Sequence, residues 1–194
     1  TSGDYQIVVY ALISRAPSRT SDPKNTDFTT VEYDEVSSDF LNFLHNGSSR
    51  TWKVDTSQWG HMGVGPADAT GPWWWGADPD SKNDLGMDDD RITFNVDGTV
   101  FYETNGDIYG KAEPIDSAWG ANGQEANADG EYVNYPLEAF SDNWYANLEK
   151  GEGGFELLAF DGYTFPGFYT GGKTYTIVER TENTMTIRTV GWDG

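Results

Sequence analysis

Three consecutive tryptophans, Trp73–Trp75, are the feature that most constrains how this chain can fold. Side chains of a β-strand point alternately to opposite faces, so three neighbouring indoles cannot all enter one core from a regular strand. Gly71 and Pro72 precede them and Gly76 follows, which favours a loop or a strand end. We therefore expect at least one of these indoles to face solvent, and exposed indole on a soluble surface usually marks a contact site.

The composition favours an all-β fold rich in turns. Of the 194 residues, 37% are hydrophobic and 15% are aromatic, so the core must be aromatic rather than aliphatic. The 23 glycines and 8 prolines are typical of short strands joined by turns. We expect an antiparallel β-sandwich, similar to a jelly roll, with at most one or two short helices.

Two segments show the alternation typical of β-hairpins. Apolar residues alternate on both sides of Asp97–Gly98, and this dipeptide fits the left-handed positions of a type I′ turn, so a hairpin is predicted over residues 92–102. Residues 175–180 and 185–190 predict a second hairpin, joined by the polar residues 181–184.

One helix is predicted over residues 35–44, with Ser37 or Ser38 as its N-cap and Asn46–Gly47 as its stop. Residues 107–132 are rich in Gly, Asn and Ala and are predicted to form a long loop, which suggests a binding face. Shorter strands are expected at residues 50–54 and 155–160.

The first 30 residues are predicted to be separate from the main domain. Residues 5–16 predict a strand that is covered on both faces, and residues 17–30 are typical of a linker or long loop. The start of this strand resembles the last strand of immunoglobulin-like PKD domains. The segment is therefore expected either to end an upstream domain or to be reused here, and residues 31–194 are assigned to the β-sandwich.

The charge and the absence of cysteine disfavour several classes of partner and site. The 32 acidic and 12 basic residues give a net charge of -20, which disfavours nucleic acid, anionic membranes and anionic glycans. Without cysteine there is no disulfide, thiolate zinc site or cysteine nucleophile. The sequence contains no apolar run of about 18 residues, so no transmembrane helix is predicted. We expect a monomer.

Two acidic stretches, Asp78–Asp80 and Asp88–Asp90, are candidate calcium sites because calcium prefers carboxylate oxygens. The EF-hand spacing fails, since Lys82 stands where the third ligand belongs. We therefore expect no bound cofactor and acids that are solvated or cap turns, with an irregular calcium site as the alternative.

The tryptophans favour a neutral polysaccharide as the partner. A sugar ring presents a face of C–H groups that stacks on an indole, and an indole loses little rotamer entropy on binding. Single tryptophans elsewhere could instead fill the core, and a histidine could simply be packed or hydrogen-bonded. The candidate carbohydrate-binding residues are Trp73, Trp74, Trp75, Trp59, His61, Trp119, Trp144, Asp78 and Asn122.

Enzyme chemistry is the main competing interpretation. Glycosidases need two carboxylates ~5–10 Å apart, and 32 acids cannot exclude such a pair. The catalytic strand of jelly-roll β-glucanases follows E-x-D-x-x-E, whereas the nearest stretch here, residues 32–37, ends in Ser37. We expect no catalytic residues. The alternatives are a jelly-roll hydrolase or lyase, and a structural or adhesion domain whose tryptophans are all core.

Five motifs resemble those of one known family. They are Thr51–Trp52, the G-H-x-G-V-G-P turn at Gly60–Pro66, Trp73–Trp75, the D-D-x-x-T-F strand at Asp89–Phe94 with its Asp97–Gly98 hairpin, and the Y-x-I hairpin at Tyr175–Ile187. Together they resemble the C-terminal domains of surface glycan-binding lipoproteins from bacterial polysaccharide-utilisation loci, which often carry PKD-type domains upstream.

The resemblance implies a β-sandwich that binds glycan without cleaving it, with laminarin-type β-1,3-glucan as the expected ligand. It also implies a place on the outer face of the bacterial outer membrane. The anchor would be a lipid on an upstream cysteine, which this sequence does not contain.

Overall fold

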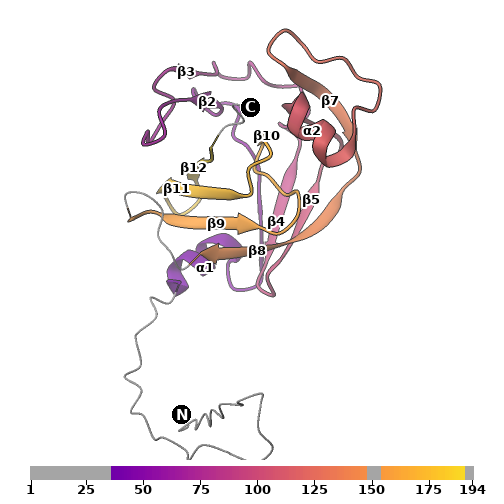
Figure 1. The fold of residues 1–194 in the computed structure, drawn as a ribbon. Helices are drawn as coiled ribbons and strands as arrows, with labels where there is room; N and C mark the ends of the chain where they lie inside the picture. Colours follow the sequence, from indigo (N-terminus) through magenta and orange to yellow (C-terminus); the bar gives the residue numbers. More distant parts are fainter. Residues whose placement is uncertain (1–35, 148–153, 191–194) are drawn as a thin grey trace, which may run out of the picture. The chain divides into compact units, whose positions relative to one another are not determined.

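The computed structural model describes residues 36–147 and 154–190, which form a mainly β structure with two short helices (Figure 1). The helices are α1 (Ser38–His45) and α2 (Ala112–Trp119). The strands are β1 (Ser49–Trp52), β2 (Gly63–Val64), β3 (Trp75–Gly76), β4 (Arg91–Asn95), β5 (Thr99–Glu103), β6 (Gly106–Lys111), β7 (Glu131–Leu137), β8 (Phe140–Asn147), β9 (Glu156–Phe160), β10 (Phe168–Tyr169), β11 (Thr174–Arg180) and β12 (Met185–Arg188).

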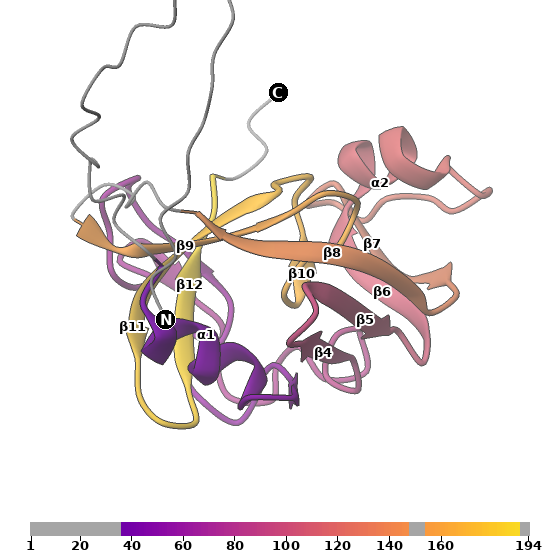
Figure 2. The ribbon, with the colours of Figure 1, turned by 90° about the horizontal axis from the view of Figure 1, so that it is seen from below.

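A seven-stranded antiparallel sheet in the order β1-β4-β5-β8-β9-β11-β12 dominates the fold, beside the smaller sheets β10-β6-β7 and β2-β3. The first half of β8 pairs with β5, and its second half, from Trp144 onward, pairs with β9. Figure 2 shows β8 as a long curved strand that passes from the β4–β5 side to β9. The curled sheet confirms the predicted all-β, sandwich-like fold.

Aromatic rings dominate the core, as the composition predicts. Phe94 meets Trp144 edge-on with ring centroids 5.5 Å apart, and Tyr102 meets Phe165 at 4.8 Å. Each such edge-to-face pair adds about 0.5–1.5 kcal/mol beyond the burial of its area. The aromatic pairs therefore do much of the packing that aliphatic residues do in most domains.

Helix α1 forms where the capping residues predict it. The Ser37 side chain accepts a hydrogen bond from the Phe40 amide at 3.1 Å, and Asn46 ends the helix in the left-handed region with φ of 51°. Phe43 and Leu44 are buried on its inner face. The predicted hairpin of β11 and β12 and the predicted strands β1 and β9 are also present.

The hairpin of β4 and β5 is confirmed, but its turn is not type I′. Gly98 has φ of 86° and its amide donates to the Asn95 carbonyl at 3.1 Å, whereas Asp97 does not have a positive φ. A type I′ turn needs a positive φ at both central residues. The prediction failed because Asp97 instead accepts hydrogen bonds from the Thr99 hydroxyl and amide, which also lower the Asp97 pKa.

The predicted long loop at residues 107–132 is wrong, because this segment contains most of β6, all of α2 and the start of β7. The sequence gives no N-cap signal for α2, since Lys111 occupies that position and makes no side-chain capping bond. Pro114 lies in the first turn, where a missing N–H costs no helical hydrogen bond. The composition of this segment is typical of a loop, although the segment forms a helix and parts of two strands.

Neither helix in the described ranges is long and apolar enough to cross a membrane. The strand and the linker predicted within residues 1–30 lie outside the described residues. The division between residues 1–30 and 31–194 stays a prediction.

Candidate functional site

Four exposed tryptophans lie on one loop, residues 55–77, which we call the tryptophan loop. Trp59, Trp73, Trp74 and Trp75 expose 60%, 64%, 73% and 45% of their surface. The prediction that at least one of the three consecutive indoles faces solvent is confirmed, since all three do. Indoles normally gain free energy from burial, so four exposed on one loop indicate a contact site.

The backbone of the loop explains this exposure. Strands β2 and β3 form a short antiparallel ribbon in which Val64 faces Trp75. The ribbon is extended by a hydrogen bond of 3.0 Å from the Trp74 amide to the Val64 carbonyl. Trp73 and Trp74 lie in a bend before β3 begins at Trp75. The irregular backbone expected around the three indoles is therefore present.

Glycines let the loop close tightly around Pro72. A Cβ atom on Gly63 would lie 2.3 Å from Cβ of Pro72, and one on Gly60 would lie 2.8 Å from its Cγ. A Cβ on Gly76 would lie 2.9 Å from Cζ2 of Trp59, so the six-membered ring of that indole rests against the backbone of β3. Spacing along the chain gives no sign of this packing, which pre-organises the indoles.

Two contacts attach the tryptophan loop to the rest of the molecule. The Arg188 guanidinium in β12 donates to the buried Ala69 carbonyl at 2.8 Å. The Asp80 amide donates to the Thr56 carbonyl at 2.8 Å. The first contact holds the middle of the loop, and the second joins the start of the loop to the segment that follows its end.

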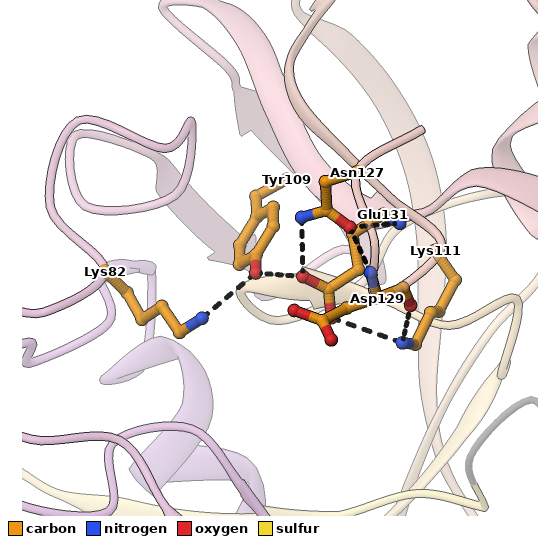
Figure 3. Close-up of polar contacts among 6 residues, drawn as sticks. All are labelled: Lys82, Tyr109, Lys111, Asn127, Asp129 and Glu131. Carbon is orange, nitrogen blue, oxygen red and sulfur yellow. Dashed lines mark hydrogen bonds and ion pairs between the residues drawn. The ribbon is translucent and has the colours of Figure 1, made fainter. Parts of the chain in front are cut away.

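Lys82 connects the loop to a polar network on β6 and β7 (Figure 3). Its Nζ lies 5.4 Å from the ring centroid of Trp75 and donates to the Tyr109 hydroxyl at 3.1 Å. The Tyr109 hydroxyl donates in turn to the Glu131 carboxylate, which also accepts from Lys111 at 3.2 Å. Sequence reasoning considered Lys82 only as the residue that breaks an EF-hand, because its partners lie far along the chain.

Burial and hydrogen bonds together set the protonation of this network. Burial raises the pKa of Glu131, but hydrogen bonds from Tyr109, Lys111 and Asn127 outweigh burial and leave that pKa below its ordinary value. Burial and the bond to Glu131 raise the pKa of Tyr109 well above its usual range. Tyr109 therefore stays protonated and Glu131 stays ionised at neutral pH.

The prediction that Trp144 is a carbohydrate-binding residue is wrong, because Trp144 is buried in the core. It exposes only 6% of its surface, its ring meets Phe94, and its indole N–H donates to the Asn95 carbonyl at 3.1 Å. Neither ring nitrogen of His61 is accessible to a sugar hydroxyl. Its Nδ1 lies 2.8 Å from the Gln58 carbonyl, and its Nε2 is covered by protein and has no partner.

The other candidates occupy two places. Asp78 is exposed directly after the loop and stays a candidate. Trp119 ends α2 half-buried, and Asn122 is exposed in the segment that follows with φ of 45°. Trp119 packs against Tyr169 and Tyr163 with ring centroids 4.8 Å and 5.3 Å away. Trp119 therefore belongs to a second aromatic group, and Asn122 follows it along the chain.

The acidic stretches do not assemble a metal centre within residues 36–147 and 154–190, where no group of three or more His, Asp or Glu is arranged to hold an ion. Asp88 instead accepts the Asp84 amide at 2.9 Å, which caps a turn. Asp90 is 2% exposed and accepts the Tyr102 hydroxyl at 2.6 Å. Burial, opposed by this hydrogen bond and aided by repulsion from Asp89, raises the Asp90 pKa to about 8.

Comparison with known proteins gives no further guide to this site. No family model matches the sequence, and no curated protein matches it. Any function must therefore be argued from the geometry and from the chemistry of these side chains.

Proposed function

We propose that this protein binds a neutral polysaccharide without cleaving it, with the tryptophan loop as the main platform. The observation that carries the proposal is the exposure of Trp59, Trp73, Trp74 and Trp75 on one closely packed loop. Sugar rings offer flat C–H faces to such indoles, and stiff side chains on a pre-formed loop lose little entropy on binding. Asp78, which is exposed and directly follows the loop along the chain, is the candidate partner for hydroxyl groups.

The ligand we favour is a β-1,3-glucan of the laminarin type, on the basis of the family resemblance. The same resemblance supports a place on the outer face of a bacterial outer membrane, where the protein would capture glycan for uptake. Stacking alone gives modest affinity per site, so tight capture would come from repeated sites along the polymer.

Binding is better supported than hydrolysis. An acid catalyst in a glycosidase needs a raised pKa and direct access to the sugar. The pKa is raised for Asp90 and for the half-buried Asp107, but the Asp90 side chain is buried against Tyr102 where no polymer reaches it, and neither residue lies on the tryptophan loop. A purely structural domain whose tryptophans are all core is disfavoured by the four exposed indoles.

Affinity electrophoresis on a panel of neutral polysaccharides that includes laminarin tests the proposal. We expect one glucan to retard the wild type, Trp74→Ala to lose that retardation, and Tyr145→Ala, an exposed aromatic on β8, to keep it. No new reducing ends should appear over a day. The absence of retardation on every polysaccharide would refute the proposal, and release of reducing ends would replace it with hydrolysis.

A further inference from the structure

We infer that the glycan site extends from the tryptophan loop to a second platform, formed by Trp119, Tyr163 and Lys173, so that the ligand is an extended chain rather than a short oligosaccharide. This inference rests on the proposed function and specifies the length of ligand that the site accepts. It is carried by an exposed aromatic group at the end of α2 and by a pairing of ring and ammonium group that Tyr163 and Trp75 share.

The second platform has an open outer ring and a supported inner one. Tyr163, between β9 and β10, exposes 44% of its surface, and its ring centroid lies 5.3 Å from that of Trp119. Trp119 is backed by Tyr169 at 4.8 Å. The end of α2 is held by a hydrogen bond of 2.7 Å from the Tyr135 hydroxyl to the Gly120 carbonyl. An exposed ring on a fixed support is the arrangement that stacking on sugar requires.

Contacts of about 5 Å connect this platform to the tryptophan loop. Lys82 lies 5.4 Å from the Trp75 ring and 5.3 Å from the Tyr109 ring. Tyr109 meets Phe168 at 4.7 Å, because β10 runs beside β6, and Tyr169, the residue after Phe168, packs on Trp119. In Figure 1, β10 lies between the β2–β3 ribbon and α2. Tyr109 and Tyr169 are buried, so these contacts support both platforms from within the fold, and a chain bound to both would cross the surface above them.

The two platforms share one chemical arrangement. Lys82 lies 5.4 Å from the Trp75 ring and uses one donor on the Tyr109 hydroxyl. Lys173 lies 5.4 Å from the Tyr163 ring and uses one donor on the Asp161 carbonyl at 3.0 Å. An ammonium group has three donors, so each platform pairs an exposed ring with N–H groups that can reach sugar hydroxyls. Two similar pairs of ring and ammonium group in the protein suit the repeated sugar residues of a polysaccharide.

Calorimetric titration with laminarin and with its oligosaccharides of increasing length tests this inference. We expect the wild type to bind longer chains more tightly. Tyr163→Ala should lose about tenfold in affinity for laminarin, while its affinity for the shortest oligosaccharide that the wild type binds stays unchanged. Tyr145→Ala is the matched control, because Tyr145 is similarly exposed, at 42% on β8, and belongs to neither platform.

The outcomes separate this inference from the proposed function. If Trp74→Ala abolishes binding but Tyr163→Ala matches the wild type at every chain length, the second platform is refuted and the first stands. An equal loss at all lengths would place Tyr163 in the first platform and also refute the inference. If the wild type binds no polysaccharide, both proposals fall. Lys173→Ala, at an exposed position, serves if Tyr163→Ala does not fold, with an expected loss of about threefold for laminarin alone.

Discussion

The core of the seven-stranded sheet and the tryptophan loop both depend on aromatic residues, but they use the rings in opposite ways. Trp144 sits in the regular strand β8, where strand partners and Phe94 surround it. Trp74 sits in a bend where glycines pack on Pro72 and leave the ring outside. The comparison teaches that the backbone of a segment, rather than the residue type, decides whether an indole stabilises the fold or faces a partner.

The largest effect expected from this difference is on stability. Trp144→Ala should reduce the free energy of unfolding by about 3–5 kcal/mol, because it opens a cavity and leaves the Asn95 carbonyl without its indole donor. Urea unfolding followed by circular dichroism measures the loss. Trp74→Ala should change stability by no more than about 0.5 kcal/mol. Equal destabilisation by the two variants would contradict the division between core and platform.

The complementary effect is on binding. Trp74→Ala should weaken binding of the retarding glucan by about tenfold or more, because one of the most exposed stacking faces is removed. Titration of intrinsic fluorescence with the glucan measures the change. A variant that binds as the wild type does would place the contact on other indoles of the loop.

A smaller effect should come from the glycine packing beneath the indoles. Gly63→Ala places a methyl group 2.3 Å from Cβ of Pro72 and 2.5 Å from the Trp75 carbonyl, so the ribbon must shift at a cost of about 1–3 kcal/mol. Binding should weaken while the main sheet stays folded. Gly71→Ala is the control in the same loop, since its nearest contact would be 3.9 Å. Equal binding by both variants would show that the packing does not position the platform.

The last effect depends on pH and concerns the core alone. Asp90 titrates near 3.8 when unfolded and near 8 when folded, so the folded state holds the proton more tightly. Its contribution to stability is complete below pH about 4 and is lost as pH rises to about 8. Asp90→Asn has no such loss, so its melting temperature relative to wild type should rise steadily from pH about 4 to pH about 8. A difference that is independent of pH would contradict the raised pKa, and glucan binding should not change.

The sequence predicted those parts of the fold whose signals are local. Alternation located both hairpins, and Ser37 and Asn46 marked the ends of α1. Helix α2 was missed because Lys111 gives no capping signal. The turn at Asp97 was misjudged because a side-chain bond to Thr99 competes with the expected conformation.

The candidate site was likewise predictable only where its signals are local. The exposure of Trp73–Trp75 followed from their own neighbours, since three adjacent indoles flanked by Gly and Pro cannot enter one core. The burial of Trp144 depends on Asn95 and Phe94, about 50 residues away. The place of Lys82 depends on Tyr109, 27 residues along the chain. Contacts of this kind leave no mark in local spacing.

The hydrogen bond between Arg188 and Ala69 joins positions 119 residues apart. A ribosome makes Ala69 long before it makes Arg188, and chains begin to fold as they emerge. The tryptophan loop can therefore dock on β12 only after the chain has been synthesised as far as Arg188. A nascent chain that stops before β12 would display its indoles without this anchor, so the platform is held in place only once β12 has joined the sheet.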